Sequence, residues 1–337
     1  MASKDKNNNS SNNDAVIIFG PTGNVGSAAA RAAREKGAAG AKVFLAMRDP
    51  QKPIPGLTPD QESEGGGGFE RIYADLTKPE TLHDAVTTTG AKRAFIYLVF
   101  GTTDHMKSAI TALKAAGIEF VVFLSSYAVP NDLNIASISP ANFIAWGHGQ
   151  VELILREEFG PLSYVAVRPG SFASNSLRWK KAVVEDGLVR IAYPEALFDW
   201  ISPEDIGRVC GALLVQRPRP VDVAGMNGNV VRLLGPEIMS QGDAIDVIGR
   251  AIGKDIKVER LDEQEGVEFF MKSAHLPEFA AQQLIKMLKK RAEDGRSDGG
   301  YEGPSYDESV SNIQKYGGRP PTSFHQWVEE NKAEFGT

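Results

Sequence analysis

Residues 15–26 read AVIIFGPTGNVG, and this stretch is the most informative part of the chain. Its first five residues are apolar without alternation, which is typical of a strand buried on both faces, as parallel strands are. The glycines that follow let the backbone turn sharply and approach a ligand that a Cβ would exclude. An alanine-rich helix comes next, and its first N–H groups and its dipole favour an anion such as a pyrophosphate. Because the glycines lie between a strand and a helix, the motif predicts a dinucleotide site.

Apolar runs alternate with helical segments along the first half of the chain. We expect strands over residues 42–47, 70–74, 94–99, 120–124 and 164–167, a Pro/Gly-rich loop over 50–68, a helix capped by Thr77, a helix capped by Asp104, and a helix over 150–159. This alternation predicts an α/β fold with a doubly wound parallel sheet of the Rossmann type.

After Gly170 the alternation loosens, although three later segments are typical of helices. They begin at Ser202, span Gln241 to Ile252 and span Leu276 to Arg291. A loop over 293–304 and an amphipathic stretch over 323–335 follow. The expected organisation is a disordered tail over residues 1–14, a Rossmann core over 15–170 and a smaller α+β lobe over 171–337, interleaved with the core.

Composition limits the possible partners. The net charge of −6 comes without a basic stripe, so we expect no nucleic-acid partner. No apolar run approaches the roughly 20 residues that span a bilayer, so we expect no membrane partner. The first residues lack the apolar core of a signal peptide, and the single cysteine, Cys210, fits a reducing compartment, so cytoplasm is the expected location. No metal is expected, because the five histidines and one cysteine lack metal-ligand spacing.

The end of the second predicted strand bears on the choice of cofactor. In this fold an acid there binds the adenosine ribose of NAD, whereas an arginine accommodates the phosphate of NADP. Arg48 stands at this end and favours NADP(H) over NAD(H), although Asp49 follows it and could bind the ribose instead. Arg48 could also form a surface pair with Asp49. Asp75 and Leu76 end the third strand, where they could flank adenine, or Asp75 could only begin a helix.

Several separate motifs, in order, resemble those of the NmrA-like family, a branch of the atypical short-chain dehydrogenases/reductases. Besides the glycine motif they are RDP at 48–50, SS at 125–126, GHGQVE at 147–152, RPGSF at 168–172, GRPP at 318–321 and FHQWVE at 324–329. The resemblance implies NADP(H) bound by Gly20, Pro21, Thr22, Gly23, Asn24, Val25, Gly26, Arg48, Asp75, Leu76, Val99, Phe100 and Gly101. It also implies that His148 contacts the nicotinamide ribose and that Gly170, Ser171 and Phe172 border the nicotinamide.

Members of that family divide between two functions. Some reduce small quinone, enone, imine or aromatic carbonyl compounds, often in natural-product pathways of secondary metabolism. Others bind the cofactor as redox sensors or transcriptional co-regulators, with little or no chemistry. The resemblance therefore implies an NADPH-dependent oxidoreductase of a small aromatic, quinone or enone-type compound, with an NADP(H)-sensing regulator that has a protein partner as the alternative.

The catalytic pair of ordinary short-chain reductases is absent from the sequence. A Tyr-x-x-x-Lys pair supplies the proton and holds the ribose in those enzymes, whereas here Ile144 and His148 occupy the two positions. The candidate catalytic residues are His148, Tyr127 and Ser125. With an ordinary pKa of about 6.5, His148 could pass a proton, or it could only contact the ribose. Tyr127 could donate a proton or only pack, and Ser125 could bind a carbonyl oxygen or only close a turn.

Aromatic residues are scattered among the segments expected above the sheet. They are Phe100, Phe143, Trp146, Phe172, Trp179, Tyr193, Phe198 and Trp200. Aromatic walls suit a flat, apolar substrate. The alternative for each of them is ordinary core packing.

Overall fold

The structure is a computed structural model, and it describes residues 15–38, 41–130, 134–217, 229–293, 301 and 303–336. The chain forms two compact units. The first consists of Met1–Ile138, Ile144–Arg168 and Glu204–Arg232, and the second of Ser139–Phe143, Pro169–Pro203 and Leu233–Thr337. The chain thus passes between the units more than once. The tail expected over 1–14 and most of the loop expected over 293–304 lie outside the described residues.

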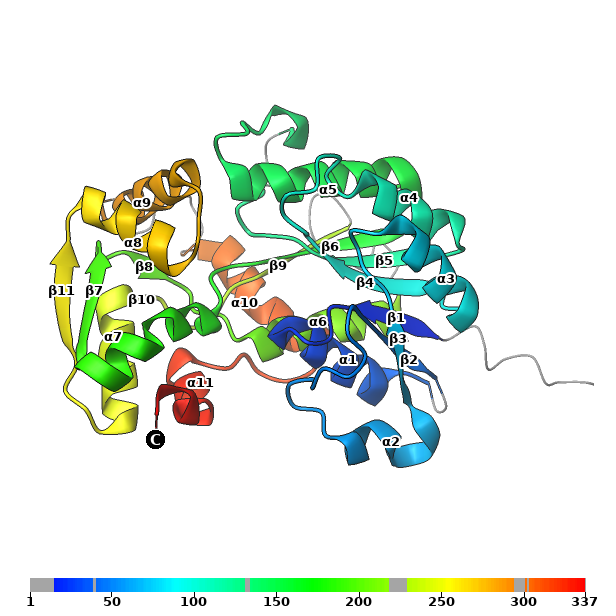
Figure 1. The fold of residues 1–337 in the computed structure, drawn as a ribbon, viewed down its shortest axis with the longest axis horizontal. Coiled ribbons are helices and arrows are strands. Elements are labelled where there is room, and N and C mark those ends of the chain that lie inside the picture. The colour runs from blue at the N-terminus through cyan, green and yellow to red at the C-terminus, as the bar shows by residue number, and fades with distance from the viewer. Residues whose placement is uncertain are drawn as a thin grey trace, which may run out of the picture. The chain divides into compact units, whose positions relative to one another are not determined.

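The first unit is built on a sheet with strand order β3-β2-β1-β4-β5-β6-β9 (Figure 1). The strands are β1 Val16–Phe19, β2 Val43–Met47, β3 Phe69–Tyr73, β4 Arg93–Tyr97, β5 Phe120–Leu124, β6 Tyr164–Pro169 and β9 Val230–Leu233. Pairing is parallel, and Ile17 lies opposite Phe44 on β2 and Ala94 on β4. The chain reverses direction across the sheet between β1 and β4, which is the switch point of a doubly wound fold. The predicted Rossmann-type parallel sheet is confirmed.

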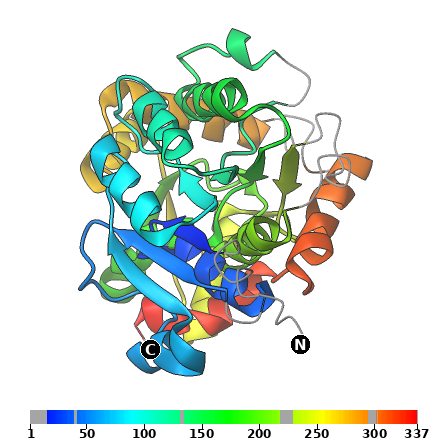
Figure 2. The same cartoon turned by 90° about the vertical axis from the view of Figure 1, so that its right-hand side faces the viewer.

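Helices cover both faces of this sheet (Figures 1 and 2). One face carries α3 Pro79–Thr89, α4 Lys107–Ala115 and α5 Phe143–Phe159, and the other carries α1 Asn24–Lys36 and α6 Pro203–Gln216. The contact between α1 and α6 is very close. A Cβ on Gly207 would lie 2.4 Å from the Cβ of Ala28, and one on Gly211 would lie 2.3 Å from the carbonyl oxygen of Ala29. Glycine at these two positions therefore sets how near the helices approach.

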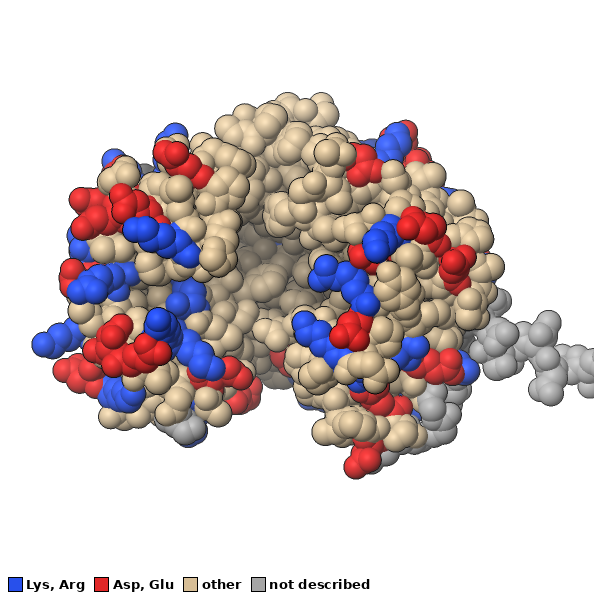
Figure 3. All heavy atoms as spheres, in the orientation of Figure 1, with Lys and Arg blue, Asp and Glu red and all other residues tan. Residues whose placement is uncertain are grey.

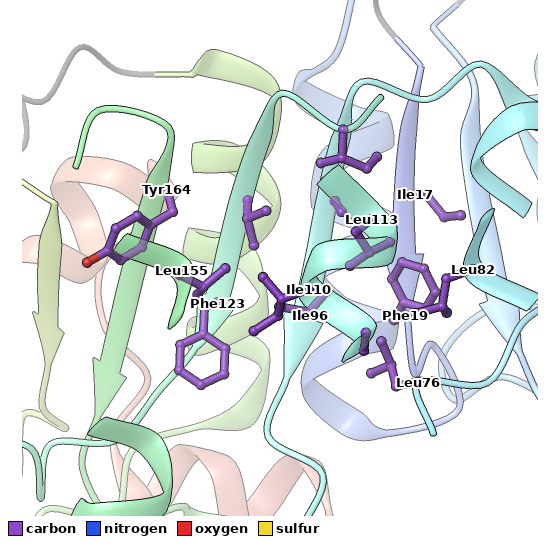
Figure 4. Packing of buried hydrophobic residues seen from close by; sticks show 14 of the residues in the cluster. Ile17, Phe19, Leu76, Leu82, Ile96, Ile110, Leu113, Phe123, Leu155 and Tyr164 are labelled. Carbon is purple, nitrogen blue, oxygen red and sulfur yellow. The ribbon is translucent and has the colours of Figure 1, made fainter. Parts of the chain in front are cut away.

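Most charged side chains lie on the surface, and apolar side chains fill the space between the sheet and its helices. On the face drawn in Figure 3, Lys and Arg are interspersed with Asp and Glu. Between sheet and helices, apolar side chains from strands meet those from α3, α4 and α5, as Ile17, Phe19, Leu82, Leu113 and Leu155 do (Figure 4). This core holds the strand ends in place, and those ends line the candidate site.

The prediction of a loop over the whole of 50–68 is wrong, because α2 Pro59–Gly67 lies within it. Thr58 and Gln61 form a capping box that starts this helix despite the glycines that follow. Arg71 on β3 holds the segment down with two hydrogen bonds to Glu62 and with bonds to the carbonyl oxygens of residues 50 and 52.

Three other predicted helix starts also differ. The helix predicted over 150–159 begins at Phe143, because Gly147 and Gly149 are close-packing positions rather than breaks. A Cβ on Gly149 would lie 2.7 Å from the side chain of Ile135. Lys78, not Thr77, precedes α3, since Thr77 bonds back to Asp75. The prediction that Asp104 caps α4 is also wrong, because Met106 is the N-cap residue. The Asp104 carboxylate nevertheless accepts the N–H groups of Met106 and Ser108.

The second unit is mixed α and β. It contains two short strand pairs, β7 Leu188–Ala192 with β11 Lys257–Leu261 and β8 Leu197–Phe198 with β10 Met239–Ser240. Its helices are α7 Gln241–Ile252, α8 Glu263–Ser273, α9 Glu278–Glu293, α10 Gly303–Gly317 and α11 Phe324–Glu330, with 3-10 turns at Ala173–Trp179 and Lys332–Phe335 and a π-helical turn at Ala182–Asp186. The prediction of α7 is confirmed to the residue, whereas α8, α10 and these strand pairs were not predicted.

Candidate functional site

The glycine motif forms a tight loop between β1 and the start of α1. Gly20 has φ +70°, and a Cβ on it would lie 2.5 Å from the ring of Tyr97. A Cβ on Gly26 would lie 2.2 Å from the carbonyl oxygen of Gly20. Gly23 is the N-cap residue of α1, without a side-chain hydrogen bond. Because the first amides of a helix have no acceptor within it, this loop offers main-chain N–H groups and a dipole to an anion.

A cleft of about 300 Å³ lies beside this loop in the first unit. The ends of β1, β2, β3 and β4 supply its lining, which consists of Phe19, Gly20, Thr22, Ala46, Met47, Arg48, Ala74, Asp75, Leu76, Thr77, Tyr97, Leu98, Val99 and Phe100. The structure thus brings together residues predicted from separate strands, namely Gly20, Thr22, Arg48, Asp75, Leu76, Val99 and Phe100. Pro21 and the residues from Gly23 to Gly26 continue the same loop into α1.

Arg48 and Asp49 differ in their hydrogen bonding. The Asp49 carboxylate accepts the Gln51 N–H at 2.9 Å and so closes a turn. Arg48 is exposed at the cleft, and among the described residues its guanidinium has no hydrogen bond or ion pair. An exposed guanidinium of this kind suits a phosphate, whose oxygens match its donors.

Asp75 also lines the cleft and is held in one orientation. Its carboxylate accepts the N–H and the hydroxyl of Thr77 at 2.9 and 2.8 Å. Burial would raise the pKa of Asp75, but the hydrogen bonds from Thr77 and the nearby charge of Arg48 outweigh burial and lower it. A fixed carboxylate and a cation therefore stand at the ends of neighbouring strands.

These residues fit a phosphorylated nicotinamide dinucleotide. Gly20 lines the cleft without a side chain, and the close contact of Gly26 with the Gly20 carbonyl oxygen packs the start of α1 against the loop. The helix amides suit a pyrophosphate, and Arg48 suits a further phosphate on the adenosine ribose.

His148 lies in the middle of α5, with its ring beside Phe100 and Phe123. Its Nδ1 lies 2.8 Å from the Ile144 carbonyl oxygen. A carbonyl oxygen only accepts, so Nδ1 carries the proton, and in the neutral ring Nε2 is an acceptor. Burial lowers the pKa of His148 below its ordinary value, against the raising effects of the Ile144 hydrogen bond and the Glu152 charge. His148 is therefore suited to accept a hydrogen bond from a hydroxyl rather than to donate a proton.

None of the three candidate catalytic residues, His148, Ser125 and Tyr127, belongs to the cleft lining. The Ser125 hydroxyl is buried and donates a hydrogen bond to Glu152 at 2.5 Å, so its donor is used inside the protein. The guanidinium of Arg232 lies over the ring of Tyr127, 4.0 Å from its centroid. Phe100, by contrast, is 59% exposed and stands edge-on to His148. Gly101 follows it with φ +87°.

The structure places Gly170, Ser171 and Phe172 in the second unit. There the buried carboxylate of Asp199 accepts the Ser171 N–H at 2.9 Å and the Gly235 N–H at 3.0 Å. A Cβ on Gly170 would lie 2.2 Å from that carboxylate, and burial raises the pKa of Asp199. No local pattern marked Asp199 in the sequence, because its partners come from distant segments.

Several aromatic residues considered as substrate walls are core residues of the second unit. Trp179, Phe198 and Trp200 are buried, and the Trp200 ring packs against Phe198, Trp179 and Phe324. For these residues the packing alternative is correct. In the first unit Trp146 instead contacts the ring of His105 on the segment after β4.

Sequence reasoning missed Tyr97 and Thr77 as lining residues. The signal for both was their place at or just after the end of a predicted parallel strand, where ligands gather. Over the described ranges, no helix combines the length and apolar character needed to cross a bilayer. The same ranges contain no group of three or more His, Cys, Asp or Glu side chains that could hold a metal ion.

Known proteins resemble this chain over most of its length. The model of the NmrA-like family matches residues 12–319. The nitrogen metabolite regulation-like protein bik4 of Gibberella fujikuroi is 39% identical over 328 residues, which cover 93% of this chain and 95% of that protein. An NAD(P)H azoreductase of Xenophilus azovorans is 23% identical over 95% of this chain and 99% of that protein.

Among solved structures, the NADPH-dependent quinone oxidoreductase QOR2 of Escherichia coli, complexed with NADPH, aligns with a TM-score of 0.67. It is 19% identical, and the alignment covers 94% of this chain and 99% of that chain, so the likeness is one of fold. Since the family model spans the glycine loop, the strand ends and the helix that carries His148, the chain belongs to the NmrA-like family.

Proposed function

We propose that this chain binds NADP(H) in the cleft and acts as an NADPH-dependent oxidoreductase on a small aromatic, quinone or enone-type compound. One observation carries the proposal. A backbone loop without room for a Cβ, at the start of α1, lies in the same cleft as an exposed arginine that has no hydrogen-bond partner among the described residues. Pyrophosphate and ribose phosphate are the two anionic groups that such a pair of sites would take.

Each proposed role follows from the chemistry of the side chain. Main-chain amides at the start of α1 hold the pyrophosphate, Arg48 holds the ribose phosphate, and His148 Nε2 accepts a hydrogen bond from a ribose hydroxyl. The reduced nicotinamide, when bound, supplies the hydride. Tyr127 is the proposed proton donor for carbonyl substrates. Quinones and enones do not require a protein proton donor, because the anion formed by hydride transfer is delocalised and water suffices to protonate it.

The proposed substrate is flat and apolar. Phe100 offers an exposed aromatic surface beside His148, and Trp146 lies on the same helix as His148. Aromatic faces favour planar apolar ligands over flexible polar ones. The proposed role in secondary metabolism rests on the family resemblance, and the proposed cytoplasmic location rests on the single cysteine and the polar first residues.

Calorimetry with NADPH and NADH, followed by NADPH oxidation over a panel of quinones, enones and aromatic carbonyl compounds, tests the proposal. We expect NADPH to bind more tightly than NADH and at least one compound to be reduced. His148→Ala and Tyr127→Phe should lower turnover, whereas His83→Ala and Tyr73→Phe, at exposed positions, should not. Tight NADPH binding without oxidation by any compound would contradict the enzymatic proposal.

A second candidate is an NADP(H)-sensing regulator of the NmrA type that acts through a protein partner. Two observations favour it. A relative that covers nearly the whole chain is named as regulation-like. In addition, His148, at the position of the usual lysine, is oriented as an acceptor and not as an acid. Affinity capture from a cell extract with NADP⁺ and with NADPH tests it, because a sensor must bind its partner differently in the two states, and equal capture would exclude this candidate.

A further inference from the structure

A buried ion pair joins two of the sequence motifs inside the first unit. Glu152 on α5 is 2% exposed and Arg168 on β6 is 1% exposed. Arg168 Nε and Nη2 donate to the two Glu152 carboxylate oxygens at 2.9 and 2.6 Å, and the Ser125 hydroxyl donates to the same carboxylate at 2.5 Å. Burying two charges carries a desolvation cost that often cancels their attraction. Stability alone is therefore a weak explanation for this pair.

The pair also holds the segment that follows β5. Arg168 Nη1 donates to the carbonyl oxygens of Val129 and Pro130 at 3.1 and 3.4 Å. Ser125 begins this segment and is bound to Glu152. Both ends of the stretch from Ser125 to Pro130 are thus attached to one buried group, and Tyr127 lies between them.

The same group lies one helical turn from His148. Residues four apart share a face of a helix, so Glu152 and His148 lie on one side of α5. The Glu152 charge acts on His148, as the raising effect on its pKa shows. Fixing Glu152 to β6 therefore fixes the rotation of α5 about its axis and, with it, the direction in which His148 points.

We propose that Glu152, through Arg168 and Ser125, is a positioning residue for the nicotinamide half of the cofactor site. This inference rests on the proposed function. In a doubly wound sheet the two halves of a dinucleotide lie on either side of the switch point. The lining described above reaches the ends of β2 and β3 on the adenosine side, whereas β5, β6 and α5 carry the buried group on the other side. Loss of the group should therefore disturb one half of the ligand and spare the other.

The test compares two ligands by calorimetry and NADPH fluorescence. One is NADPH, and the other is adenosine 2′,5′-bisphosphate, which carries the ribose phosphate but lacks the nicotinamide half. The variants are Glu152→Gln, which keeps the shape but loses the charge, and Ser125→Ala, which removes one hydrogen bond and leaves the ion pair. Glu195→Gln is the matched control, because Glu195 forms a similar two-bond pair with Arg260 on the exposed surface of the second unit.

We expect Glu152→Gln to weaken NADPH binding roughly tenfold, the effect of about one buried hydrogen bond to a charged group. Ser125→Ala should show a smaller loss in the same direction, and it keeps the test decisive if Glu152→Gln does not fold. Adenosine bisphosphate binding and the Glu195→Gln control should be unchanged. Equal weakening of both ligands, or no weakening, would overturn the positioning role while leaving the proposed function intact. Failure of the unsubstituted protein to bind either ligand would overturn both.

Discussion

The close approach of Gly26 to the glycine loop can be tested by a single methyl group. A Cβ on Gly26 would lie 2.2 Å from the Gly20 carbonyl oxygen and 2.8 Å from the Gly20 carbonyl carbon. Ordinary contact begins at 3.4 Å, so restoring it in Gly26→Ala would separate α1 from the loop by about 1.2 Å (3.4 minus 2.2). Both contacts are backbone atoms, which cannot rotate away as a side chain can. We expect a stability loss of about 1–3 kcal/mol, typical of overpacking.

The effect on cofactor binding should be about as large as the upper end of the effect on stability. A shift of this size removes main-chain hydrogen bonds to a charged phosphate, and each is worth about 1.5–3 kcal/mol. We therefore expect NADPH affinity to fall by roughly 100-fold. Calorimetry measures the affinity, and thermal unfolding of the same preparations measures the stability.

Gly23→Ala is the matched control for stability in the same loop. Gly23 has φ −92°, and the nearest heavy atom to an added Cβ is 3.6 Å away. This variant should unfold at nearly the temperature of the unsubstituted protein. If Gly26→Ala also kept its unfolding temperature and bound NADPH unchanged, the tight backbone contact would play no part in binding, and our reasoning about the loop would be wrong.

Three further predictions concern single side chains. Arg48→Ala should weaken NADPH binding by roughly 10-fold to 100-fold and leave NADH unchanged by calorimetry, with the exposed Arg250→Ala as control. Burial holds the pKa of His148 below 6.5, so its contribution to stability is complete above that pH and is lost as pH falls through the folded-state pKa. His148→Asn should therefore lose less thermal stability than the unsubstituted protein between about pH 7 and about pH 5, and an equal loss would contradict the burial argument. Cys210 is fully buried and its pKa is raised, so a thiol reagent should modify it only after denaturation.

Strands β1 to β6 and the glycine loop were predictable because their signals are local, whereas β9, at the edge of the same sheet, was not predicted. An apolar run of four or five residues marks a strand buried on both faces, and five predicted strands match β2 to β6 with shifts of only a residue or two at their ends. The helix at Pro59 could have been found from its capping box, since Thr58 and Gln61 stand three apart, but the following glycines pointed to a loop. In the second unit the strands are short and pair with distant segments, so their pattern alone did not identify them.

Part of the candidate site followed from the sequence in the same way. Residues just after parallel strands must gather at one edge of the sheet, so Arg48, Asp75 and Val99 could be assigned to one cleft from their positions alone. The direction of His148 and the role of Ser125 could not be assigned. The direction of His148 depends on the Ile144 carbonyl, which the folded helix brings within hydrogen-bonding distance. The role of Ser125 depends on the Glu152 carboxylate, which only tertiary packing brings near it.

The parallel sheet, the glycine loop and the edge proposed for a dinucleotide all follow from local sequence patterns. Backbone freedom and side-chain periodicity are properties of short stretches of chain, and they act before any tertiary contact forms. Only the tertiary structure decided that Arg168 meets Glu152 and that Asp199 meets Ser171. A buried polar group must find a partner wherever the packed elements place one, and that place is not encoded by spacing along the chain.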